Sequence, residues 1–490
     1  MAFNLGLRIV GTATRGAVPQ ALDAQGAGPL EKTGGVWDHV LGAERLDLAA
    51  FESAGWRFIP RPEAPDSFIG PNLAEKGLLT RHPQDGLVIV RDRLVVGLAE
   101  GVRPSRLKRL HPEMRRLPFG KNVHEIAFEL PDENIDDAVA FQRLRLEDEL
   151  GAGAVRFVDP VLIYNVEGPP QPPLFATTPP PVLDSPVQWQ WDQIELTAAW
   201  AVTDPRRGDD TLVAVIDRGF FESSQLNIAR HIDHRGDPIT TPMRHRWHGT
   251  FCAALVGGTL QDNFGNGAAP NCRLILVAMG ETVSSVELAA ALKTSMANGA
   301  DVISCSVAPR GRSWDGLDTV LAAVDEVEND GRGGRGTLVV LAVFNENRRI
   351  DPGSLEAHEP IVCVAPSDRN DVRAPASGFG AGLDLIAPGV SVPGLAGTDN
   401  LNAGLARASG GSFAAPCVAG VASLMLSVNP ELTAERLRNL LWESADPVVV
   451  GKQRSDEVGW GRLNALQAVQ AAIAAVPTAV VTPVPSPVPT

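Results

Sequence analysis

The sequence predicts an α/β protein whose larger part is a parallel β-sheet with helices on both faces, preceded by a small α+β domain. Between residues 188 and 475, short apolar runs alternate with helical patterns. The runs are continuous, which is typical of parallel strands buried on both faces. Residues 86–168 instead combine period-two alternation with helical spacing. That combination is typical of an antiparallel sheet with helices on one face.

Length and composition indicate a soluble protein of more than one domain. The 490 residues exceed the usual size of one domain, so two or three are expected. Apolar residues make up 44% and charged residues 21%, as in ordinary globular proteins. The formal net charge of −15 argues against nucleic acid and against an anionic membrane surface as partners, because both require a basic face.

The cysteines and the N-terminus bear on location. The five cysteines form no CxxC pair, so neither a disulfide framework nor a zinc site is expected. All five stand among apolar or small residues, as buried thiols do. We find no secretory signal pattern and no apolar run of about 18 residues. These features together predict a cytoplasmic protein.

Proline-rich stretches mark the expected boundaries. Such stretches are stiff and extended, and they rarely pack into a core. The predicted segments are 1–85 with no recognisable role, 86–168 as the α+β domain, 169–187 as a linker, 188–475 as the larger domain and 476–490 as a tail.

The element pattern follows from apolar periodicity. In the first segment we expect a helix at 36–52 and strands at 7–12 and 56–59. The α+β domain is expected to contain a strand at 93–101, a helix at 104–114, a strand at 122–131, a helix at 134–150 and one or two strands at 154–166. The larger domain is expected to contain strands at 211–217, 272–280, 300–307, 337–345 and 360–367. Its expected helices are 284–298, opened by a capping box, and 315–327.

Four polar side chains stand at strand ends or helix starts. Asp217 and Asn345 each end an expected strand, and His248 and Ser412 each precede an apolar helical run. Each also has an ordinary structural explanation: a turn for Asp217, helix caps for His248 and Ser412, and a left-handed turn for Asn345. Ligands of parallel sheets bind beyond the carboxyl ends of the strands, where these groups could meet. Together they would supply a nucleophile, a base, a carboxylate that orients the base, and an oxyanion donor.

The motifs around these residues resemble those of a known family. The order Asp, His, Ser is that of the subtilisins. The stretches "VAVIDRG", "HGTFCAA" and "GGSFAAPCVAG" resemble the three motifs of the subtilisin-like serine peptidases (subtilase, S8 family), and the resemblance covers residues 188 to about 475. It implies a catalytic triad of Asp217, His248 and Ser412, with Asn345 as oxyanion donor beside the backbone N–H of Ser412.

The resemblance also implies how substrate binds. Ser306, Val307 and Ala308 resemble the edge segment that pairs with an extended peptide substrate. Phe344 lies where the family has a small residue that lines the pocket for the side chain before the cleaved bond. We expect its ring to narrow this pocket and to favour Ala, Ser or Gly there. The alternative is that the ring turns into the core and leaves the pocket open.

A further implication concerns residues 86–168. They resemble the ferredoxin-like pro-domain that assists folding and blocks the active site in many subtilases. The protein is therefore expected to be made as a self-inhibited precursor. Cleavage is expected between about Asn165 and Ser185.

The sequence departs from the family in several places. Arg218 replaces a Ser or Thr after the aspartate, Gly411 replaces a common Thr at small expected cost, and Cys417 replaces a frequent His. The loop at 261–267 is shortened relative to the calcium loop of many relatives, so no metal and no cofactor is expected.

The expected function is therefore a serine endopeptidase acting on a protein or peptide substrate. One alternative is a weakened or inactive subtilase-fold binding protein, because Arg218 and Phe344 are unusual. An α/β-hydrolase esterase would need G-x-S-x-G and the order Ser, Asp, His. A sedolisin would have Glu in place of His248. An imidazole base favours activity near neutral pH or above.

Overall fold

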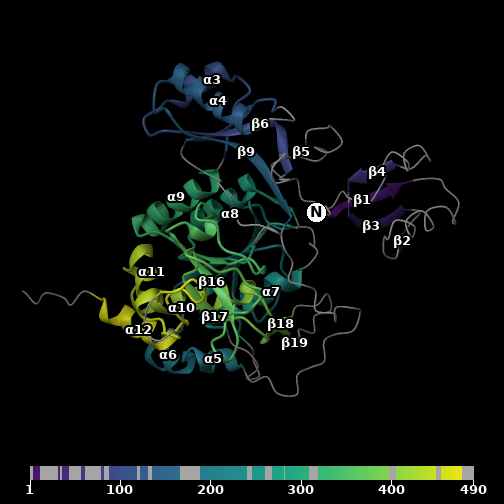
Figure 1. The fold of residues 1–490 in the computed structure, drawn as a ribbon. Helices are drawn as coiled ribbons and strands as arrows, with labels where there is room; N and C mark the ends of the chain where they lie inside the picture. The colour runs from purple at the N-terminus through teal and green to yellow at the C-terminus, as the bar shows by residue number, and fades with distance from the viewer. Residues whose placement is uncertain are drawn as a thin grey trace, which may run out of the picture.

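The larger part of the chain is built on a seven-stranded parallel sheet (Figure 1). The structure is a computed structural model that describes residues 4–10, 31–33, 36–42, 57–60, 79–81, 88–117, 122–130, 135–165, 188–239, 246–259, 267–280, 282–307, 318–396, 404–448 and 454–476. The strands of the sheet are, in spatial order, β11 (Ile228–Asp233), β12 (Arg273–Ala278), β10 (Leu212–Asp217), β14 (Val302–Cys305), β15 (Leu338–Ala342), β16 (Ile361–Ser367) and β17 (Leu385–Pro388). The five strands expected in this region are confirmed, each within a few residues.

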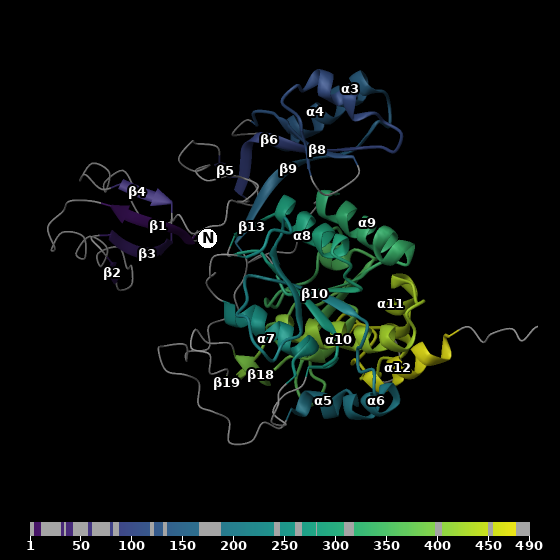
Figure 2. The ribbon, with the colours of Figure 1, turned by 180° about the vertical axis from the view of Figure 1, so that it is seen from behind.

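Both faces of this sheet are buried, which explains the continuous apolar runs. Along β10, Val213 and Val215 face one hydrophobic cluster, and Ala214 and Ile216 face the other. One face is covered by α8 (Ser285–Ala297) and α9 (Asp318–Gly334, irregular from Gly331). The other is covered by α5 (Trp189–Gln193), α6 (Leu196–Thr203), α7 (Arg246–Gly257), α10 (Gly411–Val428), α11 (Ala434–Glu443) and α12 (Ala465–Ala474) (Figure 2).

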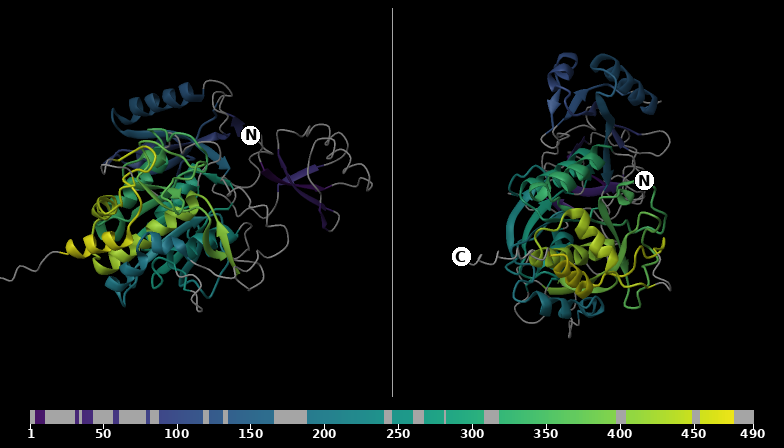
Figure 3. Two further views of the ribbon diagram at one scale, coloured as in Figure 1. Left: turned by 60° about the horizontal axis from the view of Figure 1, so that its bottom comes forward. Right: turned by 90° about the vertical axis from the view of Figure 1, so that its left-hand side faces the viewer.

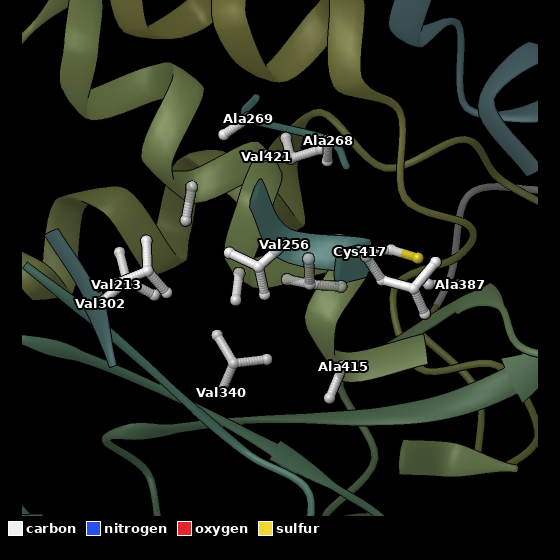
Figure 4. Close-up of a cluster of buried hydrophobic side chains, with 14 of the residues drawn as sticks. Val213, Val256, Ala268, Ala269, Val302, Val340, Ala387, Ala415, Cys417 and Val421 are labelled. Atoms are coloured by element: carbon white, nitrogen blue, oxygen red, sulfur yellow. The ribbon is translucent and has the colours of Figure 1, made fainter. Parts of the chain in front are cut away.

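Helix α10 is the central element of the second layer. It is 18 residues long and, among the described helices, is the one apolar enough to cross a membrane, yet 94% of that stretch is buried inside the protein. Figure 4 shows side chains of α7 and α10, including Val256 and Val421, above Val213 and Val340 of the sheet. The apolar composition of α10 therefore reflects its place in the core.

The smaller α+β domain forms a second, antiparallel sheet. Its strands are β5 (Leu79–Arg81), β6 (Val88–Leu98), β7 (Arg115–Arg116), β8 (Val123–Ala127) and β9 (Val155–Asn165), with helices α3 (Pro104–Leu110) and α4 (Ile135–Leu150). The spatial order is β13-β9-β6-β8-β7, with β5 beside β6. The first strand, β13 (Thr282–Ser284), comes from the larger domain. The elements expected at 86–168 are confirmed, and 154–166 forms one strand.

The two faces of this second sheet have different neighbours. The side chains of α3 and α4 pack on one face, where Leu107 and Leu146 belong to the same hydrophobic cluster as Leu94. On the other face, Val95 and Phe157 join a cluster with small side chains of α8 and α9: Val286, Ala289, Ala290, Ala322 and Ala323. The α+β domain, blue in Figure 3, therefore lies on the helices α8 and α9.

The N-terminal segment contains strands β1 (Asn4–Val10), β2 (Glu31–Thr33), β3 (Val36–Gly42) and β4 (Arg57–Pro60) in the antiparallel order β2-β3-β1-β4. The helix expected from residue 36 is wrong over β3, which pairs with β1 along its whole length. Residues 43–52 of that helix lie outside the described part. The strands expected at 7–12 and 56–59 overlap β1 and β4.

The remaining elements complete the larger domain. A short 3-10 helix spans Leu355–Ala357, and a hairpin of β18 (Val392–Ala396) and β19 (Gly404–Ala408) precedes α10. The linker expected at 169–187, residues 477–490 of the expected tail, and most of the shortened loop at 261–267 lie outside the described residues.

Candidate active site

The three side chains expected to form a triad come from three different elements. Asp217 ends β10, His248 lies in the first turn of α7, and Ser412 lies in the first turn of α10. They are 0%, 1% and 8% exposed. His248 Nδ1 lies 2.8 Å from both carboxylate oxygens of Asp217. Since a carboxylate only accepts, Nδ1 carries the proton, and Nε2 keeps a lone pair with which to accept one.

The carboxylate of Asp217 is held by a backbone N–H as well as by the imidazole. The N–H of Arg218 donates to Asp217 Oδ1 at 2.7 Å. The residue after the aspartate therefore supports the carboxylate through its main chain, although it has no hydroxyl. The bond from the Arg218 N–H is the local contact that a turn residue makes. The hydrogen bond between Asp217 and His248 joins residues 31 positions apart, and a turn does not explain it.

Ser412 does not cap its helix. The N-cap of α10 is Gly410, and no side chain caps that end. Ser412 Oγ instead lies 3.5 Å from the carbonyl oxygen of Ser306. Among the described residues, His248 Nε2 has no hydrogen-bond partner. The hydroxyl of Ser412 and Nε2 of His248 are therefore not hydrogen bonded here, and such catalytic contacts commonly tighten only when substrate binds.

Pro416 shapes the backbone beneath the nucleophile. A proline in a helix has no N–H for the carbonyl four residues earlier, which here belongs to Ser412. That carbonyl accepts hydrogen bonds from Ser306 Oγ at 3.0 Å and from Cys252 Sγ at 3.2 Å. The start of α10 is thereby tied to the end of β14 and to α7.

The amide of Asn345 has a defined orientation. Asn345 follows β15, and its Oδ1 accepts the N–H of Gly411 at 2.9 Å. Because a backbone N–H can only donate, this contact fixes which end of the amide is oxygen and leaves Nδ2 as a donor. Asn345 is absent from the described non-glycine residues with positive φ, so the left-handed turn explanation does not hold.

The two glycines before Ser412 allow this close approach. A Cβ on Gly411 would lie 2.5 Å from the carbonyl oxygen of Val343. Gly410 has φ of 148°, and a Cβ there would lie 3.1 Å from Asn345 Oδ1. A side chain at residue 411 would require a shift of the backbone. The sequence analysis treated the exchange of Thr for glycine as a change of small cost, whereas this structure requires glycine at residue 411.

Phe344 is fixed by its neighbours. Its side chain is fully buried, and the guanidinium carbon of Arg348 lies 3.7 Å from the ring centroid. A Cβ added to Gly378 would lie 2.6 Å from the ring. The ring is thus held between a cation and a glycine, and it also belongs to the hydrophobic cluster on the α8–α9 face.

Two segments flank Asp217 at the edge of the sheet. On one side, Ser306 follows β14 and donates its N–H to Ile216 at 3.1 Å. Val307 is buried, and Ala308 lies outside the described residues. On the other side, the chain leaves β12 at Ala278 and passes Gly280, whose N–H donates to the carbonyl oxygen of Arg218 at 2.9 Å, before β13 begins. Sequence analysis missed β13, because three residues are too few for a periodic signal.

Cys252 lies directly beneath the site. Ligand atoms of Asp217, His248 and Cys252 lie within 4.8 Å of one another, so this group has the composition of a metal site. Burial, followed by the charge of Asp217, raises the pKa of the Cys252 thiol well above its usual value. The thiol therefore stays protonated and donates to Ser412. A metal would need the thiolate and would break the bond between Asp217 and His248.

Comparison with known proteins places this geometry in a family. The model of the subtilase family (Peptidase_S8) matches residues 208–461, which is more than half of the chain. The match includes all four residues of the site. A solved structure of MycP3 protease from the type VII (ESX-3) secretion system is 21% identical, with a TM-score of 0.50, and covers 63% of this chain and 91% of that one. It supports the fold alone.

Two curated relatives carry names of proteases. The calcium-dependent protease of Nostoc sp. (strain PCC 7120) is 31% identical over 326 residues, covering 57% of this chain and 48% of that protein. The halolysin-like extracellular serine protease Nep of Natrialba magadii is 26% identical over 425 residues, covering 82% and 72%. The chain spans about half the length of the Nostoc relative.

The relatives overturn one expectation and support another. The predicted cytoplasmic location is wrong, since a relative that matches most of the chain is named as extracellular. Buried thiols are compatible with either location, because no disulfide partner is required of them. The expected family is confirmed by the match over residues 208–461: the chain belongs to the subtilase family.

Proposed function

We propose that this protein is a serine-type endopeptidase that uses Asp217, His248 and Ser412 as its triad. The observation that carries the proposal is the contact of His248 Nδ1 with both oxygens of Asp217, at 2.8 Å, beside the start of α10. This contact fixes the tautomer that a general base needs. The protease names of the relatives support the same reaction class.

The geometry supports the following steps. Ser412 Oγ turns to His248 Nε2, gives up its proton and attacks the substrate carbonyl. Asp217 stabilises the resulting imidazolium. Asn345 Nδ2 and the Ser412 N–H donate to the oxyanion, and the start of α10 adds positive potential. His248 then protonates the leaving amine, and a water molecule releases the acyl group.

The substrate is proposed to be a protein or peptide in extended conformation. Ser306 and Val307 lie on one side of Asp217, and the segment from Gly280 into β13 lies on the other. A peptide strand between them can hydrogen bond with main-chain groups on both sides, which is strand addition. Phe344, before the oxyanion donor, is proposed to limit the side chain that precedes the cleaved bond.

We also infer that the α+β domain is a ferredoxin-like pro-domain that inhibits the peptidase. The order β9-β6-β8-β7, with antiparallel pairs throughout and two helices on one face, supports this fold. Its other face covers α8 and α9, and its last strand is paired with β13, next to the triad. A chain made in this form would be self-inhibited until β9 is displaced or cut.

The test compares the full chain with Ser412→Ala and His248→Ala on casein and fluorogenic peptides. We expect each substitution to lower kcat/KM by several orders of magnitude, as removal of a triad member does. Ser427→Ala, at the far end of the same helix, is the matched control and should retain activity. Undiminished hydrolysis by Ser412→Ala would refute the proposal. A wild-type protein that binds peptides but cleaves none would be the inactive binding protein.

A further inference from the structure

The imidazole of His248 contacts two aromatic rings. Trp247 precedes it in α7, and the two ring centroids are 5.6 Å apart with an angle of 81° between the ring planes. Phe413 follows Ser412 in α10, and its ring centroid lies 5.2 Å from that of His248, at an angle of 57°. Aromatic rings with centroids about 4.5–7 Å apart attract one another. The sequence neighbours of the proposed base and of the proposed nucleophile therefore both pack against the imidazole.

The ring of Phe413 is fixed by the core around it. Phe413 and Phe251 are both 0% exposed, and their ring centroids lie 4.8 Å apart at an angle of 65°. A Cβ added to Gly394 of β18 would lie 2.6 Å from the Phe251 ring, so that ring is in turn packed against the hairpin. Because such a core is close-packed, Phe413 has no room to turn away from His248.

Trp247 supports the imidazole from the accessible part of α7. Its side chain is half-buried and packs against the hydrophobic cluster that α7 and α10 form above the sheet. A change at Trp247 therefore alters the contact with His248 while the buried ring of Phe413 stays in place. This makes Trp247 the more suitable of the two for substitution.

The imidazole needs support beyond its bond to Asp217. That bond holds Nδ1 alone, at 2.8 Å from each carboxylate oxygen, and a ring held at one atom can still tilt about it. Among the described residues, His248 Nε2 has no hydrogen-bond partner to limit the tilt. A misplacement of about 1 Å at a reacting atom can lower a rate about 100-fold. The packing of the ring therefore bears directly on proton transfer.

We propose that Trp247 and Phe413 are positioning residues for the proposed reaction. Their rings restrict the tilt of the His248 imidazole and keep Nε2 where it can take the proton of the Ser412 hydroxyl. Both act through His248 and not through contact with substrate. This inference rests on the proposed endopeptidase function.

The first experiment measures steady-state kinetics on a fluorogenic peptide, with the full chain under conditions in which it hydrolyses casein. Trp247→Ala should lower kcat about 10- to 100-fold with little change in KM, because the base is misplaced while the substrate still binds. Trp247→Phe keeps a ring beside the imidazole and should recover most of kcat. The matched control is Trp442→Ala, since Trp442 is also half-buried and packs against the same cluster; it should leave kcat unchanged.

The second experiment observes the imidazole without turnover. In Ser412→Ala protein, the Nδ1 proton of His248, bonded to Asp217, should give a low-field proton NMR signal that exchanges slowly with water. Adding Trp247→Ala should broaden or remove this signal, because a ring that tilts opens the bond to solvent. Adding Trp247→Phe or Trp442→Ala should leave the signal in place.

Three results would overturn the inference. An effect of Trp247→Ala on KM alone would mean that Trp247 binds substrate, and equal losses of kcat in Trp247→Ala and Trp442→Ala would mean a general weakening of the fold. An unchanged Nδ1 signal in the Trp247→Ala protein would show that the ring does not restrain the imidazole. If the wild-type protein hydrolyses casein and Trp247→Ala has full kcat, the positioning role fails while the endopeptidase stands. If the wild-type protein hydrolyses nothing, the endopeptidase fails, and the NMR comparison still decides whether the rings hold the imidazole.

Discussion

We expect the contact between Asp159 and the first turn of α9 to make a measurable difference to how tightly the α+β domain binds the larger domain. The first N–H groups of a helix have no partner within it and need an acceptor from outside. Among the described residues, Asp159 accepts both the N–H and the hydroxyl of Thr319. Asp159→Ala removes a cap worth about 1 kcal/mol and a side-chain hydrogen bond worth about 1 kcal/mol. The sum of about 2 kcal/mol corresponds to about 30-fold in Kd.

The assay uses residues 86–168 expressed separately and labelled, with residues 188–475 carrying Ser412→Ala. Fluorescence anisotropy gives Kd, and circular dichroism checks that each variant is folded. Asp148→Ala, an exposed aspartate on α4, is the control and should leave Kd unchanged. Binding of the Asp159→Ala variant within about twofold of wild type would refute the role given to this contact, because even a weak cap contributes about 0.5 kcal/mol.

We expect the carboxylate of Asp159 to make the binding of the α+β domain to the larger domain depend on pH. Burial, reinforced by Asp318 and opposed by Thr319 and Arg143, raises the pKa of Asp159 to about 7. In the separated domain Asp159 should have an ordinary pKa of about 4. A carboxyl group whose pKa is higher in the complex than in the free domain binds its proton more tightly in the complex. It therefore favours association fully at pH values below the free pKa, and this contribution is lost as the pH rises through the pKa of the complex. Kd should therefore increase between pH 5 and pH 8 for wild type and stay flat for Asp159→Asn. A wild-type Kd that decreases from pH 5 to pH 8 would contradict a raised pKa of Asp159 in the complex.

Two further substitutions test the reaction centre. Asn345→Ala should lower kcat by about 100- to 1000-fold with little change in KM, since an oxyanion donor acts in the transition state; steady-state kinetics on a peptide would show a change confined to KM if the residue only binds substrate. The wild-type protein should prefer peptides with Ala, Ser or Gly before the cleaved bond over those with Phe or Leu. The Phe344→Gly variant should have the reverse preference, with a change of at least about tenfold in the ratio of kcat/KM values. The reason is that even one methylene in such a pocket is worth about 1–3 kcal/mol. A positional peptide library decides this, and a wild-type preference for Phe that Phe344→Gly leaves unmoved would place the ring outside the pocket.

Much of the fold could be predicted, because it is encoded locally. Strands such as β10 and β16 are continuous apolar runs that alternate with helical patterns, and the capping box at Ser284 and Glu287 opens α8 as expected. The four candidate site residues could be proposed from the sequence because they stand at strand ends and helix starts, which a parallel sheet brings to one edge. These signals come from residues that are close together in the sequence, so the sequence of one protein is enough to recognise them.

Other features depend on contacts that local patterns do not contain. Residues 36–42 have spacing that suits a helix, but pairing with β1 makes them a strand. β13 exists because β9 pairs with it. The need for glycine at residue 411 comes from the carbonyl of Val343, far away in sequence. The link from Cys252 to Ser412 likewise crosses 160 residues. Each of these features could be recognised only from the folded structure.

The most direct test of the account is to treat the purified full chain with a fluorophosphonate probe and to map the labelled residue by mass spectrometry. The account predicts one labelled site, Ser412, with label lost in Ser412→Ala and strongly slowed in His248→Ala, because only an activated serine attacks the phosphorus. Labelling of a different serine, or hydrolysis of casein by a chain whose Ser412 takes no label, would contradict it.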